Sequence, residues 1–117
     1  MDTKIIIGRR GSGKTLALIK RSAETGATII SPSKFMAERV WIEANKNGFI
    51  IPYPLSIDEF MHMMQNPLFY KTNLRRRGVL IDEAQITLQH ILASSKILGI
   101  TVNDYDNIEY LDSKEED

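Results

Sequence analysis

The sequence predicts an α/β protein built on a mostly parallel sheet that helices cover on both faces. Short apolar runs alternate along the chain with longer runs of helical periodicity, a pattern typical of parallel strands joined by crossover helices. Residues 78–82 are almost continuously apolar, as expected of a strand buried on both faces. The chain has 117 residues, 43% of them hydrophobic, so we expect one domain with a substantial core.

Each expected element has a local signal. Strands are expected where short apolar runs end at Gly, Pro or polar residues, namely at 4–7, 28–30, 49–51, 78–82 and 97–102. Residues 108–111 are compatible with a further short edge strand. Helices are expected where apolar residues form one stripe, at 14–24, 34–46 and 84–94. Another helix should begin at a capping box formed by Ser56 and Glu59 and should end before Pro67.

The first expected strand runs into a glycine-rich loop that fits the pattern G-x-x-x-x-G-K-[ST] at every fixed position. Such glycines let successive backbone N–H groups converge on an anion, and the helix that follows adds its positive end. Lys14 should reach the β- and γ-phosphates of a nucleotide, and the Thr15 hydroxyl should bind Mg²⁺. The alternative is a glycine-rich turn with an incidental lysine. The predicted phosphate-binding residues are Gly8, Arg9, Arg10, Gly11, Ser12, Gly13, Lys14, Thr15 and Leu16.

Two adjacent carboxylates, Asp82 and Glu83, follow the strand expected at 78–82. Asp82 at the strand tip is predicted to hold Mg²⁺ through a bound water molecule. Glu83 is predicted to orient or deprotonate the water that attacks the γ-phosphate. The alternative is an acidic helix N-terminus with no catalytic role. This pair distinguishes nucleotide hydrolysis from nucleotide binding alone.

With these two motifs the chain resembles P-loop NTPases of the branch in which a catalytic glutamate follows the Walker B aspartate. That branch includes AAA+ proteins, RecA-like motors, helicases, packaging ATPases and zonula-occludens-toxin-like phage assembly ATPases. The resemblance covers residues 4–103. It implies a RecA-like core, a three-layer αβα sandwich with a five-stranded sheet, with ATP and Mg²⁺ as ligands. Residues 1–103 would then form the core and residues 104–117 an acidic tail.

The segment Asp82-Glu83-Ala84-Gln85 is similar to the corresponding boxes of helicases and phage ATPases. The resemblance therefore implies ATP hydrolysis coupled to a DNA transaction such as replication, recombination or packaging. It also implies that Asn103, after the last expected strand, contacts the γ-phosphate or the attacking water; a turn-forming Asn is the alternative. ATP is preferred to GTP because no Asn-Lys-x-Asp motif occurs.

A helicase needs two such cores, and this chain shows one, so we expect another copy or a partner to complete the active site. Arg9 and Arg10 are expected to face solvent or a neighbouring subunit, with a contact to the chain's own nucleotide as the alternative. The missing second core also favours an alternative function, an ATP-dependent switch that docks a partner and hydrolyses ATP slowly alone. A small-molecule kinase is a third reading, which the adjacency of Asp82 and Glu83 disfavours.

Charge is unevenly distributed although the chain is neutral overall. Residues 104–117 carry seven acids and one lysine, and the remainder is correspondingly basic, most densely at Arg75, Arg76 and Arg77. A five-residue strand spans roughly 17 Å, so this cluster should lie at the opposite edge of the sheet from its own nucleotide. It could bind nucleic-acid phosphates, reach a neighbour's site or remain ordinary charged surface.

Composition excludes several classes of protein. The absence of Cys excludes disulfide scaffolds, Cys-ligated zinc and thiol nucleophiles. The longest apolar runs are far below the ~18 residues of a membrane span, so no membrane association is expected. We expect a cytoplasmic protein, in the host cytoplasm if a phage encodes it. His62 and His90 have no acidic partner that the sequence identifies, and both are expected to be structural.

Overall fold

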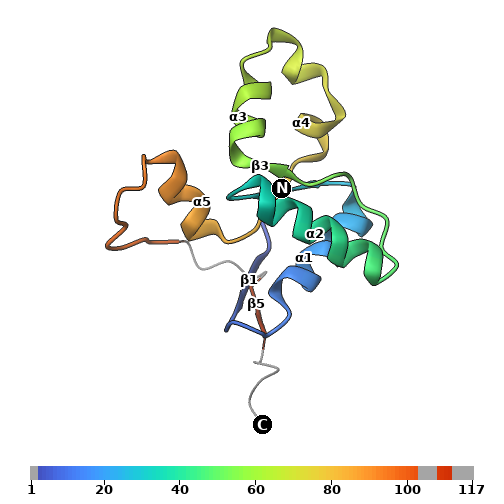
Figure 1. Ribbon diagram of the computed structural model, residues 1–117, viewed down its shortest axis with the longest axis vertical. Coiled ribbons are helices and arrows are strands. Elements are labelled where there is room, and N and C mark those ends of the chain that lie inside the picture. Colours follow the sequence, from blue (N-terminus) through green and yellow to red (C-terminus); the bar gives the residue numbers. More distant parts are fainter. Residues whose placement is uncertain (1–2, 103–107, 112–117) are drawn as a thin grey trace.

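The computed structural model describes residues 3–102 and 108–111 of the chain. Figure 1 shows the arrangement of the helices and strands. In chain order these are β1 (Ile5–Gly8), α1 (Lys14–Thr25), β2 (Thr28–Ser31), α2 (Lys34–Lys46), β3 (Leu55–Ser56), α3 (Ile57–Met64), the 3-10 helix η1 (Pro67–Lys71), α4 (Asn73–Arg77), β4 (Val79–Ile81), α5 (Ala84–Ile91) and β5 (Ile108–Leu111).

The fold is α/β with parallel strands, as predicted, but the strands of the described residues form two small sheets. β1 pairs with β5, and β2 lies between β3 and β4. All three pairings are parallel, with Ile5 opposite Ile108 in the first sheet and Ile30 opposite Ile81 in the second. All four residues of β2 are buried, because strands flank it on both sides. The single five-stranded sheet expected from the sequence is therefore not what the structure contains.

The prediction of a strand at 49–51 is wrong. The N–H of Phe49 donates to the carbonyl of Ala44, so this segment begins by turning back onto the end of α2. Ile51 enters the core, whereas Ile50 is 91% exposed. Prolines at positions 52 and 54 cannot donate a ladder hydrogen bond, and the strand that pairs with β2 starts only after them, at Leu55.

The strand expected at 97–102 is also absent. Its alternating apolar residues Leu98, Ile100 and Val102 are exposed, since no described strand edge pairs with the segment. The edge strand considered at 108–111 does form, as β5 beside β1. An ion pair of 2.8 Å between Lys4 and Glu109 accompanies that pairing.

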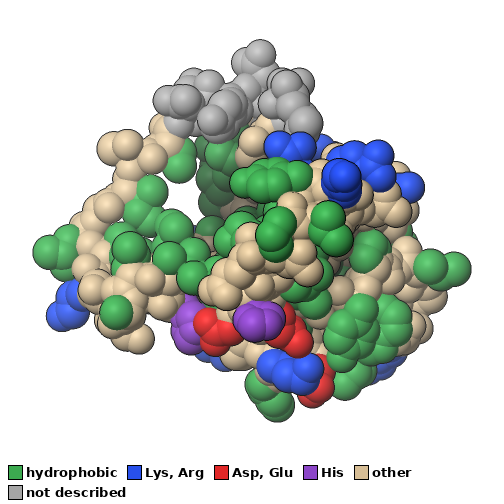
Figure 2. Space-filling model, turned by 90° about the horizontal axis from the view of Figure 1, so that it is seen from above, with side chains coloured by type: hydrophobic (Ala, Val, Ile, Leu, Met, Phe, Trp, Pro, Cys, Tyr) green, Lys and Arg blue, Asp and Glu red, His purple; other side chains and the backbone are tan. Residues whose placement is uncertain are grey.

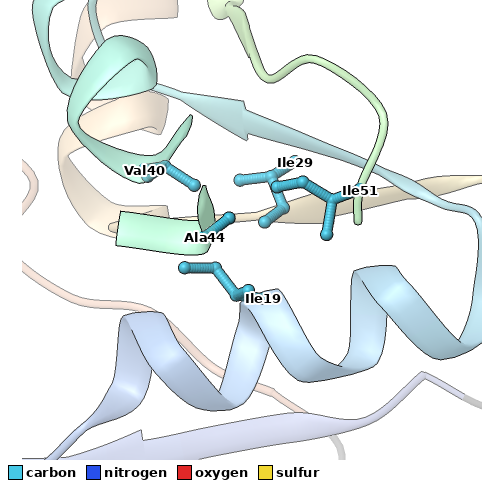
Figure 3. Close-up of a cluster of buried hydrophobic side chains, with 5 residues drawn as sticks. All are labelled: Ile19, Ile29, Val40, Ala44 and Ile51. Atoms are coloured by element: carbon cyan, nitrogen blue, oxygen red, sulfur yellow. The ribbon is translucent and has the colours of Figure 1, made fainter. Parts of the chain in front are cut away.

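The core lies where α1 and α2 pack against β2. Its central cluster is shown in Figure 3 and consists of Ile19, Ile29, Val40, Ala44 and Ile51. Burying each of its isoleucine and valine side chains contributes about 1.5 to 3 kcal/mol relative to leaving it in water. The cluster thus fixes α1, and with it the loop that precedes α1, relative to the three-stranded sheet.

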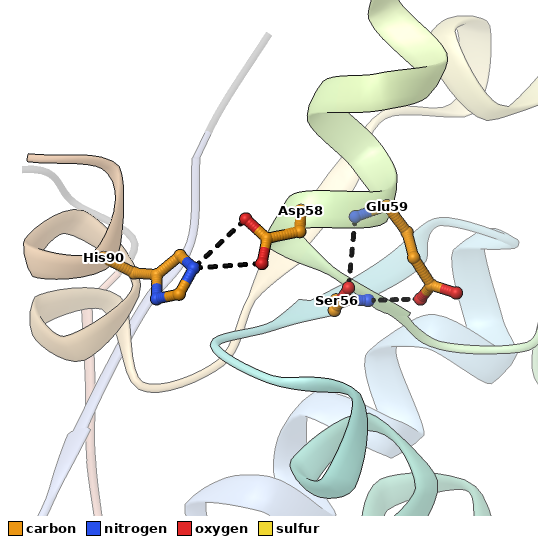
Figure 4. Close-up of polar contacts among 4 residues, drawn as sticks. All are labelled: Ser56, Asp58, Glu59 and His90. Atoms are coloured by element: carbon orange, nitrogen blue, oxygen red, sulfur yellow. Dashed lines mark hydrogen bonds and ion pairs between the residues drawn. The ribbon is translucent and has the colours of Figure 1, made fainter. Parts of the chain in front are cut away.

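The predicted capping box is confirmed. The backbone N–H of Ser56 donates to Glu59 Oε1, and the N–H of Glu59 donates to Ser56 Oγ, at 2.9 and 3.1 Å (Figure 4). Helix α3 ends before Pro67, as predicted, and η1 and α4 follow in the segment that contains the basic cluster of Arg75, Arg76 and Arg77. In the described part of the chain, no helix combines the length and apolarity needed to cross a membrane.

Candidate functional site

The glycine-rich loop joins β1 directly to α1. Within it the N–H of Ser12 donates to the carbonyl of Arg9, at 3.0 Å, which forms a tight turn. Gly11 and Gly13 have φ values of +80° and +91°, a region that side chains with a Cβ rarely adopt. This backbone suits the convergence of N–H groups that an anion requires.

Helix α1 begins without a cap. Gly13 at its N-cap has no side chain to accept a hydrogen bond, and the first turn contains no acidic residue. The first N–H groups of the helix therefore stay available, and the positive end of the helix dipole has no compensating charge on its own first turn. Both properties favour a negatively charged ligand at this end of α1.

The side chains of Lys14 and Ser12 both lie close to Gly8. Lys14 Nζ donates a 2.7 Å hydrogen bond to the carbonyl of Gly8 and so closes the loop on itself. Ser12 is 5% exposed, and its Oγ has no hydrogen-bond partner among the described residues. A Cβ at Gly8 would collide with that hydroxyl, so the packing requires glycine there.

Asp82 lies at the carboxyl end of β4. Its backbone is held on both sides, since its N–H donates to the carbonyl of Ile30 and its own carbonyl accepts from Thr87 Oγ1. Only 8% of the residue is exposed. Burial, reinforced by the negative charge of Glu83, raises the pKa of the Asp82 carboxyl to about 6, and the positive charge of Lys14 partly opposes this rise. A buried carboxylate of this kind favours a nearby cation.

Glu83 has an unusual backbone. Its φ of +50° and ψ of +59° lie in the left-handed region, and it occupies the N-cap position of α5. Such a conformation costs a residue other than glycine of the order of 1 kcal/mol, and such residues cluster at functional sites. The turn leaves the Glu83 side chain exposed directly after the buried Asp82.

One cavity of about 800 Å³ brings the two sequence motifs together. Arg10, Thr15 and Leu16 line it from the loop and the start of α1, and Asp82 and Glu83 line it from the end of β4. The predicted metal ligands Thr15 and Asp82 therefore share one cavity with the predicted catalytic Glu83. Arg10, expected to face solvent or a neighbour, is exposed and also contributes to the wall of this cavity.

The other predicted site residues lie elsewhere. Ser12 and Gly13 line a smaller cavity of about 350 Å³ that α1 forms with β1 and β5. Gly8, Arg9, Gly11 and Lys14 line neither cavity, although Lys14 is close enough to influence Asp82 electrostatically. Asn103 lies outside the described residues.

Helix α2 supplies a third wall of the larger cavity, which the sequence does not predict. Its charged members are Arg39, Glu43 and Lys46, and Phe35 lies beside them. The negative charge of Glu43 contributes to the raised pKa of Asp82. The helical spacing of these residues would have placed them on one face of α2, but nothing local indicates that this face borders the glycine-rich loop.

A buried hydroxyl lies beside Asp82 in the sheet. Ser31 is fully buried at the end of β2, and its Oγ has no partner among the described residues. Ile29 and Leu80 both pack on the core cluster. Because side chains alternate along a strand, Ser31 and Asp82 lie on that same face, two residues further along their strands. An unpartnered buried hydroxyl is costly and adds to the polarity around Asp82.

His90 has an acidic partner that the sequence did not identify. His90 Nε2 lies 3.1 Å from both carboxylate oxygens of Asp58, so the pair connects α5 with α3 (Figure 4). Both side chains are exposed. Asp58 and His90 lie on different helices, and sequence spacing carries no signal for such a contact.

Comparisons with protein-family models, with curated proteins and with solved structures give no match for this chain. The features that bear on its function are therefore the loop, the carboxylate pair and the cavity that they share.

Proposed function

We propose that the chain is a P-loop NTPase with a RecA-like core, which binds ATP together with Mg²⁺ and hydrolyses the γ-phosphate in the service of a DNA transaction. The observation that carries the proposal is the cavity lined jointly by Thr15, Asp82 and Glu83. These residues come from two motifs that are distant in the sequence. A glycine-rich turn with an incidental lysine has no reason to face a buried aspartate across a cavity of nucleotide size.

Phosphate binding draws on three features of the loop. The left-handed glycines give the loop a backbone on which N–H groups can converge, the uncapped start of α1 adds further donors, and Lys14 adds a full positive charge. The Lys14 ammonium donates to the carbonyl of Gly8. A triphosphate would compete for it, because a charged oxygen accepts more strongly than a carbonyl.

The residues present fit Mg²⁺. A hydroxyl and a buried carboxylate are the hard oxygen ligands that this ion prefers, and it keeps several ligands for phosphate oxygens and water. Thr15 would contribute the hydroxyl, and Asp82 would act directly or through a water molecule. Asp82 belongs to none of the ion pairs among the described residues, so its charge is available to a cation. When bound, the ion neutralises charge that develops on the phosphates.

Glu83 is suited to act on the attacking water. Its carboxylate is exposed on the cavity wall, next to Asp82, and can accept a hydrogen bond from water that approaches the γ-phosphate. The proton lost from that water would pass to a Glu83 carboxylate oxygen as the new P–O bond forms and the bond to the β-phosphate oxygen breaks. Arg10 on the same wall can stabilise the negative charge, which supplements the expected contribution from another copy or a partner.

A second candidate is the ATP-dependent switch that docks a partner and hydrolyses ATP slowly alone. Helix α5 follows Glu83 directly, and several of its apolar side chains are exposed: Ile86, Leu88, Ile91 and Leu92. In Figure 1 this helix projects away from α1 and α2. A helix connected to the catalytic glutamate and carrying exposed apolar residues is suited to report the state of the nucleotide to a partner.

Steady-state ATP hydrolysis, measured over a range of protein concentrations with and without DNA, tests the proposal and separates the two candidates. A Mg²⁺-dependent rate that rises more than linearly with protein, or rises with DNA, supports a motor completed by a second copy. A slow, linear rate indifferent to DNA supports the switch. Absence of both Mg²⁺-dependent ATP binding and hydrolysis in folded protein would overturn the proposal.

A further inference from the structure

A surface on η1 and α4 combines exposed apolar and basic side chains. It consists of Leu68, Tyr70, Lys71, Arg75 and Arg76, and we call it the basic-aromatic patch. The Tyr70 ring is 69% exposed, and the Arg75 guanidinium lies over it with Cζ 5.5 Å from the ring centroid. The aromatic ring and the cation therefore form one unit rather than two independent side chains.

The local structure holds this unit in place. Phe69 is buried and packs edge-on against Phe60 of α3, with ring centroids 5.6 Å apart, which anchors η1. Tyr70, the next residue, packs against Phe69 and faces outward. Thr72 caps α4 by accepting from the N–H of Arg75, and its hydroxyl donates to the Phe69 carbonyl. The exposed ring is thus supported by a buried one and by a capped helix.

Arg77 is set apart from the other arginines of the cluster. Its side chain lies across Gly26, the left-handed C-cap of α1, with Cζ 3.3 Å from where a Cβ would be. A positive charge at the carboxyl end of a helix is favourable, so Arg77 is placed to interact with the end of α1. The basic members of the patch are Lys71, Arg75 and Arg76.

The segment that carries the patch contains positive charges and no negative ones. No acidic residue occurs between Glu59 and Asp82 in the sequence. None of the ion pairs among the described residues involves Lys71, Arg75 or Arg76. Figure 2 looks onto the end of the molecule that carries α3 and α4 and shows a group of Lys and Arg side chains beside hydrophobic ones, apart from the Asp and Glu side chains of that face.

We propose that the basic-aromatic patch binds single-stranded nucleic acid. Lys71, Arg75 and Arg76 would contact successive phosphates, and a base would stack on the Tyr70 ring. A single strand is favoured over a duplex because its bases are free to leave their neighbours and stack on protein. An acidic polypeptide would satisfy the cations but would leave the exposed ring without a partner. The proposal specifies the surface for the DNA partner of the proposed function.

Fluorescence anisotropy of a labelled oligo(dT), titrated with full-length protein without ATP, tests the patch independently of hydrolysis. We expect wild-type binding that weakens with salt. Tyr70→Ala should weaken binding at least about fivefold, which is the lower range for loss of one stacked base. Tyr70→Phe should bind like wild type, because the ring is kept. Arg75→Gln with Arg76→Gln should weaken binding and flatten its dependence on salt.

Matched controls come from elsewhere in the chain. Tyr110→Ala removes an equally exposed tyrosine from β5, and Lys96→Gln removes a positive charge after α5; neither should alter binding. An abasic oligonucleotide of the same length should bind wild type and Tyr70→Ala equally. Circular dichroism and thermal unfolding check that each variant is folded.

Three results would overturn the proposal. The first is equal affinity of folded Tyr70→Ala and wild type for oligo(dT). The second is equal affinity of wild type for oligo(dT) and the abasic strand. The third is competition by polyglutamate as effective as that by unlabelled oligo(dT), which would identify an acidic polypeptide as the partner. ATP binding measured in the same preparation separates these results from a failure of the proposed function.

Discussion

The ammonium group of Lys14 donates a 2.7 Å hydrogen bond to the carbonyl oxygen of Gly8, so the residue near the end of the loop is tied to the residue that begins it. The loop is therefore held in shape by the same cation that would bind phosphate. Binding of a triphosphate requires this hydrogen bond to be replaced or shared, which makes Lys14 the first residue to test.

Lys14→Ala should weaken ATP binding at least tenfold. The variant loses a charge-assisted contact to phosphate, of about 1.5 to 3 kcal/mol, together with the bond that shapes the loop. Titration of a fluorescent ATP analogue measures the change. Lys20→Ala, which removes an exposed lysine from the same helix, should leave affinity unchanged. Equal affinities for Lys14→Ala and wild type would contradict phosphate binding by the loop.

Asp82→Asn should make the ligand-free protein more stable above pH 6. The pKa of Asp82 in the folded state, about 6, is higher than its ordinary value of 3.8. The folded protein then binds the proton more tightly than the unfolded chain does, so stability falls as pH rises from about 4 to about 6 and is not lowered further by this group above that. The corresponding penalty at pH 7.5 is of the order of 2 to 3 kcal/mol.

Urea unfolding of wild type and Asp82→Asn at pH 4 and pH 7.5 checks this expectation. The stability advantage of the variant should be small at pH 4 and large at pH 7.5, because wild-type Asp82 is then ionised. The same variant should lose the Mg²⁺ dependence of ATP binding. A stability difference that is the same at both pH values would show that the Asp82 carboxyl titrates normally.

Glu83→Gln should bind ATP with Mg²⁺ as wild type does, yet hydrolyse it roughly 10²- to 10⁴-fold more slowly. The amide keeps the shape of the side chain but cannot accept the proton from water. Single-turnover hydrolysis beside equilibrium binding measures the two effects separately. Glu38→Gln alters an exposed glutamate of α2 and serves as the matched control. Turnover by Glu83→Gln at the wild-type rate would move the role of base to another residue.

Glu83→Gly should be more stable than Glu83→Ala by about 1 kcal/mol. The backbone at this position is left-handed, with φ of +50°, which glycine adopts without the steric cost that a Cβ imposes. Glycine ordinarily lowers stability relative to alanine, so the sign of the difference is diagnostic. Thermal or urea unfolding of the two variants measures it, and an alanine variant as stable as the glycine variant would argue against the left-handed turn.

The parts of the site that were predictable from sequence depend on neighbours in the chain. The glycine-rich loop with its left-handed glycines follows from glycines at fixed spacing, and the capping box of Ser56 and Glu59 from a three-residue offset. Helices α1 and α2 follow from their apolar stripes, which pack as expected on β2. Each of these signals is complete within about a dozen residues of chain, so no tertiary information is needed.

The parts that were not predictable depend on distant partners. Residues 97–102 have the alternation of a strand, but alternation does not reveal whether a neighbouring edge is available, and no described strand pairs with them. Residues 49–51 are apolar because Ile51 enters the core, not because they pair. The contribution of α2 to the cavity, and the contact of His90 with Asp58, join elements that only the folded chain brings together.

The division of the strands into two sheets has a mechanical consequence. The glycine-rich loop follows β1, and the strand that pairs with β1 among the described residues is β5. Asp82 and Glu83 follow β4, which pairs with the fully buried β2 of the other sheet. A ligand held by both motifs would therefore connect the two sheets a second time, in addition to the packing of α1 against β2. Amides of Ile29 and Ile30 should be protected from deuterium exchange with or without ATP. Those of β1 should exchange more slowly when the nucleotide is bound.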